Sequence, residues 1–167
     1  MQLTRFTDYS LRVLMYLAIH NERRCTVKEV AEFYGVSQNH LVKVVHNLAQ
    51  LGYIESSKGK GGGISLLKAP EQMNLKDLVL ELEPSLTLVE CFDDSTNTCR
   101  IAGNCGLKGI LQQAMSAMIN HLDGFTVADT LTAFTAQRSF DQNESALPDI
   151  MPVTVTNAMH GKDNKKR

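Results

Sequence analysis

Three of the four cysteines, Cys91, Cys99 and Cys105, fall within one polar stretch of the chain, CFDDSTNTCRIAGNC. Seven and then five residues separate them, so they do not line one face of one helix and converge only if the stretch folds around something that they bind. Thiolates bind zinc, copper(I) or iron–sulfur clusters. Three thiolates leave a four-coordinate centre one ligand short, and the residues alone do not identify the fourth ligand.

Two other interpretations of the cysteines must be weighed. A free cysteine is often a small buried hydrophobe, which is what we expect of Cys25, but a polar stretch offers no core for three such residues. Disulfide bonds need an oxidising compartment. The chain begins MQLTRFTDYS, without an apolar signal segment, so we expect a cytoplasmic, reducing location. There, clustered cysteines favour metal or redox roles over structural bridges.

Length and charge bound the function further. The 167 residues are 43% hydrophobic, which suffices for one core and an additional long element. No apolar run reaches the ~20 residues of a membrane span, so we expect a soluble protein with no membrane partner. Residues 1–69 carry nine Lys/Arg against five Asp/Glu, whereas residues 70–140 carry four against nine. This asymmetry favours an anionic partner for the first half.

The first half reads as a series of short helices. Residues 7–20 form an amphipathic helix with a predicted buried stripe of Leu11, Leu14, Met15 and Ala18. Asp8 and Arg12 lie one turn apart off this stripe, which by itself predicts a surface ion pair.

A helix-turn-helix is predicted next. Thr26 and Glu29 match a capping box that starts a helix through about Phe33. After a turn at Gly35, Ser37 caps a second helix that ends at Gly52. The inward face of the second helix is apolar and consists of Leu41, Val44, Val45, Leu48 and Leu51.

The outward face of that second helix predicts DNA contacts. Its first turns carry Ser37, Gln38, Asn39, His40 and Lys43. Gln and Asn can bond to adenine edges and Lys to guanine or phosphate, and recognition helices meet bases through their N-terminal turns. A solvated face of any helix could hold the same residues. The elements that follow in the chain decide between these two interpretations.

Two short strands, residues 53–57 and 64–67, flank a turn that contains four glycines with Lys58 and Lys60. Such a hairpin is a basic "wing" that can approach a phosphate backbone. A nucleotide-binding P-loop is the alternative, but no helix follows the glycines and the Gly-Lys-Ser/Thr ending is absent. We therefore predict a mainly α fold with a small β-hairpin wing, a winged helix-turn-helix.

The second half supplies a long helix. Asn74 and Asp77 open a helix that Pro84 stops, and Thr126 with Asp129 caps a short one through about Phe134. Between them, residues 107–122 repeat apolar positions over more than four turns, which indicates packing on a partner. We expect this partner to be the same helix of a second subunit. A homodimer would read a palindromic DNA site. We divide the chain into a DNA-binding domain (1–83), a cysteine loop with a dimerisation helix (84–140) and a disordered tail (141–167).

With these pieces assembled, the chain resembles the Rrf-type family of bacterial iron–sulfur winged-helix regulators. The matching stretches are MQLTRFTDYSLR, YGVSQNHLVKVVHNLAQLGYI, KGKGGGISL, LELEP and the cysteine triplet before the long helix. The resemblance implies a homodimer in which Cys91, Cys99 and Cys105 bind an iron–sulfur cluster. Asp8 of the other subunit would supply the fourth ligand, and Arg12 would hydrogen-bond this carboxylate or offset the cluster's charge.

The resemblance is to the nitric-oxide-sensing branch of that family. Another branch takes a His shortly after its third cysteine, whereas here residue 108 is Lys and no His follows until His121. The resemblance implies a repressor that releases DNA when nitric oxide attacks the cluster, so that detoxification genes are derepressed. A 4Fe-4S cluster is favoured over 2Fe-2S by analogy.

Rival interpretations remain at this point. One is a regulator of the same family that senses cluster supply or redox state. Another is a zinc-stapled or metal-free winged helix that binds proteins. An enzyme with the cluster as electron carrier is less favoured, because no catalytic constellation or substrate pocket is evident near the cysteines.

Overall fold

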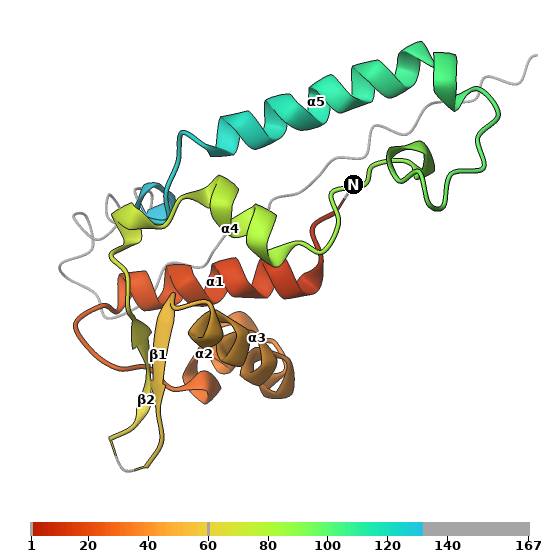
Figure 1. The fold of residues 1–167 in the computed structure, drawn as a ribbon. Coiled ribbons are helices and arrows are strands. Elements are labelled where there is room, and N and C mark those ends of the chain that lie inside the picture. Colours follow the sequence, from red (N-terminus) through yellow and green to blue (C-terminus); the bar gives the residue numbers. More distant parts are fainter. Residues whose placement is uncertain (1, 60, 132–167) are drawn as a thin grey trace, which may run out of the picture.

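The central element of the fold is helix α1 (Arg5–Ile19), seen in a computed structural model that describes residues 2–59 and 61–131 (Figure 1). Its predicted stripe is only partly right. Leu14 and Ala18 are buried, but Leu11 and Met15 are half-buried, while Val13, Tyr16 and Leu17 are buried instead. The reason is that α1 packs against α3 (Gln38–Gln50), α4 (Leu75–Leu82), the second wing strand and the last short helix, so more than one of its faces is covered.

The helix-turn-helix consists of α2 (Val27–Tyr34) and α3 (Gln38–Gln50). The capping box at Thr26 and Glu29 is present as predicted. Gly35 has a left-handed φ of 63°, which a residue with a side chain rarely adopts, and this conformation allows the tight turn. Ser37 is the N-cap of α3 as predicted, although its side chain makes no capping hydrogen bond.

The wing is the antiparallel pair β1 (Ile54–Ser57) and β2 (Gly63–Leu66), with Ile54 opposite Leu66 and Ser57 opposite Gly63. Backbone hydrogen bonds between Cys25 and Ile64, at 2.9 and 2.8 Å, join the start of β2 to the segment before α2. A Cβ at Gly63 would lie 2.5 Å from the Cys25 carbonyl oxygen, so only glycine permits this approach. The wing is thereby fixed to the helical body.

The second half returns to the same body. After the 3-10 helix η1 (Pro70–Gln72), α4 (Leu75–Leu82) begins at Asn74, whose side chain accepts from the N–H groups of Lys76 and Asp77 as predicted. The cysteine loop contains the 3-10 turns η2 (Glu90–Phe92) and η3 (Ala102–Asn104) and leads to α5 (Gly106–Leu122). After α5, Thr126 forms an antiparallel β-bridge with Asn74, and the next residue, Val127, is buried.

The predicted final helix is a 3-10 turn, η4 (Ala128–Leu131), preceded by Thr126 bonded to the Asp129 carboxylate at 2.7 and 2.8 Å. Its predicted continuation to about Phe134, and the predicted tail 141–167, lie outside the described residues. No helix in the described ranges is long and apolar enough to cross a membrane.

Helix α5 stands out because none of its residues is buried. In Figure 1 it runs above α4, on the side away from α1 and the wing, and it packs against α4. Apolar side chains on it face solvent: Leu107 is 61% exposed, Ile110 64% and Met118 37%.

Candidate DNA-binding face and cysteine loop

The two faces of α3 divide as the sequence predicts. Its inward side chains Leu41, Val44, Val45 and Leu48 are buried in the core. The polar residues of its first turns are exposed, namely Ser37, Gln38, Asn39, His40 and Lys43. In the described part of the chain none of these five side chains has an ion-pair or side-chain hydrogen-bond partner, so their donors and acceptors are available to a ligand.

The wing extends beyond this face. Lys58 is exposed beside Gly59 and Gly61, which have φ values of 99° and 83°, so the tip is held in a conformation typical of glycine. Lys60 falls outside the described residues. Along β1, Arg24 donates to Ser57 Oγ at 2.9 Å and forms an ion pair with Glu55. The sequence analysis did not identify this arginine, which braces the outer face of β1.

The three cysteines of the loop occupy different local structures. Cys91 is buried in η2, Cys99 is half-buried and its N–H donates to Asn97 Oδ1 at 3.0 Å, and Cys105 is the N-cap of α5. All three are free thiols. Cys25, by contrast, is fully buried in the core, and burial raises the pKa of its thiol. The expectation that it is a core residue is confirmed.

The described residues contain no group of three or more His, Cys, Asp or Glu side chains placed to hold a metal ion. A single chain therefore does not bring the predicted ligand set together. The donor chemistry nevertheless fits an iron–sulfur cluster, because three free thiols lie in one loop and one of them caps a helix. The positive end of the α5 dipole favours the negative charge of thiolate ligands.

Asp8 and Arg12 form the ion pair that their spacing predicts. Arg12 Nε donates to Asp8 Oδ1 and its Nη2 lies by Oδ2, both at 2.9 Å, so the pair is bidentate. The guanidinium also lies 6.0 Å from the ring centre of Tyr9 and 5.7 Å from that of Tyr34. Burial raises the pKa of Tyr34 to about 12. The two aromatic rings and the bidentate geometry hold the Asp8 carboxylate at the half-exposed side of α1.

A contact that the sequence analysis missed ties the start of α1 to the end of α4. Thr4, the N-cap of α1, donates its N–H to Glu83 Oε2 at 3.0 Å and its hydroxyl to the same oxygen at 3.2 Å. Glu83 follows α4 and precedes the cysteine loop, so this carboxylate joins the helix that carries Asp8 to the segment that carries the thiols. The partners are 79 positions apart in the chain, and no local sequence pattern predicts their contact.

A second polar cluster joins α1 to α2. Tyr16 Oη donates to Glu29 Oε1 at 2.8 Å, and Arg23 pairs with the same carboxylate. The hydrogen bond from Arg23, helped by those from Tyr16 and the Thr26 backbone, lowers the pKa of Glu29 to about 2. Burial and the hydrogen bond to Glu29 raise the pKa of Tyr16 to about 12. The cluster holds the helix-turn-helix against α1.

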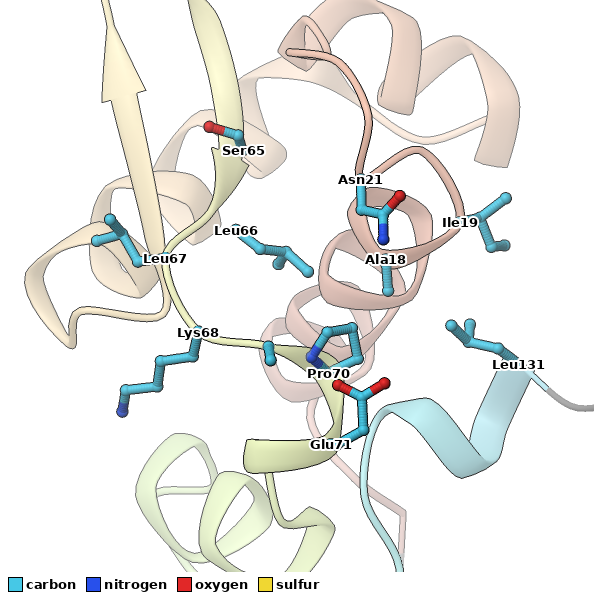
Figure 2. Close-up of a pocket in the computed structure, with 11 residues that line it drawn as sticks. Ala18, Ile19, Asn21, Ser65, Leu66, Leu67, Lys68, Pro70, Glu71 and Leu131 are labelled. Atoms are coloured by element: carbon cyan, nitrogen blue, oxygen red, sulfur yellow. The ribbon is translucent and has the colours of Figure 1, made fainter.

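The cavity in Figure 2 has a volume of about 600 Å³ and lies between the end of α1, the end of β2 and η1. Its lining is aliphatic apart from Asn21, Ser65, Lys68 and Glu71, and Leu131 closes one side. It contains neither a thiol nor a side chain of the α3 face. It is separate from both predicted sites.

The match to known families decides the class of protein. The family model described as Rrf2, iron-dependent transcriptional regulator, matches residues 3–133. The chain belongs to the Rrf2 family. The match includes the winged helix, the cysteine loop and α5, so this Rrf2 chain is a DNA-binding transcriptional regulator.

Similar proteins of known name lie within that family. The chain is 49% identical over 133 residues to the HTH-type transcriptional regulator NsrR of Halalkalibacterium halodurans, which covers 79% of this chain and 91% of the relative. It is 45% identical over 130 residues to NsrR of Bacillus subtilis, covering 77% and 89%. The predicted resemblance is thus confirmed as sequence similarity to NsrR proteins.

Solved structures with the same fold include two other regulators. T. potens IscR aligns with a TM-score of 0.62 at 21% identity over 89% of this chain and 94% of its own. CymR, the global cysteine regulator of B. subtilis, aligns with a TM-score of 0.64 at 22% identity over 80% and 98%. These likenesses confirm the predicted fold class, mainly α with a hairpin wing.

Proposed function

We propose that this Rrf2 protein is a homodimeric repressor of the NsrR type, whose iron–sulfur cluster senses nitric oxide and controls the DNA affinity of the winged helix. The observation that carries this proposal is one chain's combination of an exposed α3 face, a loop of three free thiols and 49% identity to NsrR. The genes released from repression would be those for nitric-oxide detoxification.

DNA binding would use the α3 face and the wing. Gln38 and Asn39 have the side-chain amides that bond to adenine edges, and Lys43 can reach guanine or phosphate. Lys58, with Lys60, would follow the backbone or the minor groove. Two copies joined through α5 would present two such faces to a palindrome, whose half-sites lie one helical turn, ~34–36 Å, apart.

The apolar side of α5 supports the dimer. Leu107, Ile110 and Met118 are large and exposed and by their spacing fall on one side of the helix, and a contiguous exposed apolar patch is typical of an interaction site. Packing the same face of a second copy against them would bury this surface in an isologous contact.

Cys91, Cys99 and Cys105 would hold the cluster together with Asp8 of the second copy, and 4Fe-4S is the favoured form. When bound, the cluster supplies iron that reacts with nitric oxide. A carboxylate is a weaker ligand for iron than a thiolate, so the Asp8 link is the one most readily lost. Arg12, bonded to both Asp8 oxygens, would position the carboxylate and then re-form the ion pair with it.

Loss of the Asp8 link would act on the dimer as a whole. Asp8 lies on α1, against which α3 packs, and the link would join this helix to the other subunit's loop. Without it the two α3 helices are free to change their separation. DNA affinity falls because the half-site spacing is fixed by the double helix.

The test is DNA binding by the anaerobically purified protein before and after nitric oxide. The proposal requires a brown iron–sulfur absorption that nitric oxide bleaches together with a loss of DNA affinity. Asp8→Asn, which keeps the size but not the charge of the side chain, should bind DNA weakly even before nitric oxide is added, because it lacks the carboxylate that forms the link. A cluster whose bleaching leaves DNA binding unchanged would favour sensing of cluster supply or redox state, and a colourless protein with stoichiometric zinc would refute cluster sensing.

A further inference from the structure

A small cavity lies where the first turns of α1 meet the first turns of α3. Its volume is about 210 Å³, and it is lined by Arg5, Phe6 and Tyr9 of α1 and by His40 and Lys43 of α3. Two of its five lining residues therefore belong to the predicted recognition face. The cavity continues that face onto a helix that the sequence analysis did not connect with DNA.

The charges around this cavity are not balanced by the protein. Arg5, His40 and Lys43 are exposed, and none of them forms an ion pair within residues 2–59 and 61–131. Asp8, the acidic residue nearest along α1, is held by Arg12 instead. The site therefore presents the two cationic side chains of Arg5 and Lys43, with His40 also in its lining.

The walls between the cations are apolar. Phe6 and Tyr9 are half-buried and pack against the hydrophobic core, so their rings form a fixed surface. An anion that also carries hydrocarbon would fit such a site better than a free inorganic anion. A DNA backbone has this chemistry, because each phosphodiester is joined to the apolar ring of a deoxyribose.

We propose that the first turn of α1 is a third DNA-contacting element, in which Arg5 binds a backbone phosphate and Phe6 and Tyr9 contact the adjoining sugar. This inference rests on the proposed function, since it needs α3 to face DNA. It names a residue, Arg5, whose contact is independent of base sequence and which positions the protein on the duplex.

The placement of Arg5 also deepens the sensing mechanism. Arg5 and Asp8 are three residues apart, so they occupy the same turn of α1. Any movement of this turn when Asp8 changes partner moves the phosphate contact with it. The same helical turn thereby carries the cluster ligand Asp8 and the phosphate contact of Arg5. A change at the cluster would then affect DNA binding through this turn as well as through the spacing of the two α3 helices.

The test compares Arg5→Gln with Arg5→Lys in the cluster-loaded full chain. The DNA is a duplex selected from a random pool by the wild-type protein, and dissociation constants are measured over a range of salt concentrations. Arg5→Gln should weaken binding and reduce the slope of log affinity against log salt by about 0.9 per lost phosphate contact, so about 2 for a dimer. Arg5→Lys should restore most of the slope. Lys68→Gln, which removes one exposed charge beside Tyr53, controls for net charge and should leave the slope unchanged.

The outcomes separate this inference from the proposed function. Arg5 is exposed, so thermal unfolding of Arg5→Gln should match that of the wild type and exclude misfolding. If the wild type selects a duplex and Arg5→Gln keeps the wild-type slope, the Arg5 contact is refuted while DNA binding stands. If the wild type selects no duplex, the proposed function itself fails and this inference fails with it.

Discussion

Removing the Glu83 carboxylate should destabilise the junction between α1 and α4 by an amount that the structure lets us estimate. Two donors of Thr4 bond to one Glu83 oxygen, at 3.0 and 3.2 Å. A hydrogen bond to a charged group contributes roughly 1.5–3 kcal/mol, and an anion near a helix N-terminus roughly 0.3–1 kcal/mol. Glu83 is half-buried, so values near the lower ends apply. Both donors share one carboxylate oxygen, so we count them as a single charged hydrogen bond. We expect Glu83→Ala to lower the free energy of unfolding by about 2 kcal/mol and Glu83→Gln, which keeps an acceptor, by about 0.5–1 kcal/mol.

The assay is urea unfolding of the metal-free protein at one fixed protein concentration, followed by circular dichroism. The midpoint should fall while the slope stays constant, because the change affects stability and not the surface exposed on unfolding. Glu22→Gln is the matched control, since Glu22 is exposed after α1 and forms no ion pair in the described residues. A loss for Glu83→Ala no larger than that of the control would refute the coupling of α1 to the start of the cysteine loop.

Three further predictions follow from other contacts. The folded-state pKa of Glu29 is about 2 against an ordinary 4.5, so its pairing with Arg23 stabilises the fold above pH ~4.5, and this stabilisation is lost as the pH falls toward 2. Glu29→Gln should remove this part of the acid-unfolding curve. An unchanged curve would contradict the prediction. Cys25→Ser should retain the visible absorption of the cluster-loaded protein and Cys91→Ser should lose it; the opposite result would exclude Cys91 as a ligand. Ile110→Glu, at a 64% exposed position of α5, should shift the protein from dimer to monomer in light scattering without lowering its helical content; a persistent dimer would place the interface elsewhere.

Local signals in the sequence predict most of the architecture. The capping box at Thr26, the turn at Gly35 and the Asn74 cap each depend on residues within a few positions of one another, so the helix starts could be read directly. The alternation of buried and exposed positions on α3 follows for the same reason. The stripe on α1 was only partly right because α1 is covered from several sides, and a single helical period describes one face.

Long-range contacts could not be read in the same way. Thr4 with Glu83, Arg24 with Glu55 and the cavity shared by α1 and α3 bring together residues that are 31 or more positions apart, and nothing in their own surroundings predicts a partner. The cysteine triplet is the opposite case. Its spacing predicts a shared ligand, yet the described single chain does not assemble the site.

The most direct measurement of the central claim is a stepwise nitric oxide titration of the anaerobic, cluster-loaded protein bound to its selected duplex. Iron–sulfur absorption and DNA occupancy are recorded in the same sample. The account predicts that occupancy falls in parallel with the absorption, and that Asp8→Asn, which lacks the link, has low occupancy before any nitric oxide is added. Full DNA occupancy after the absorption is gone would contradict it.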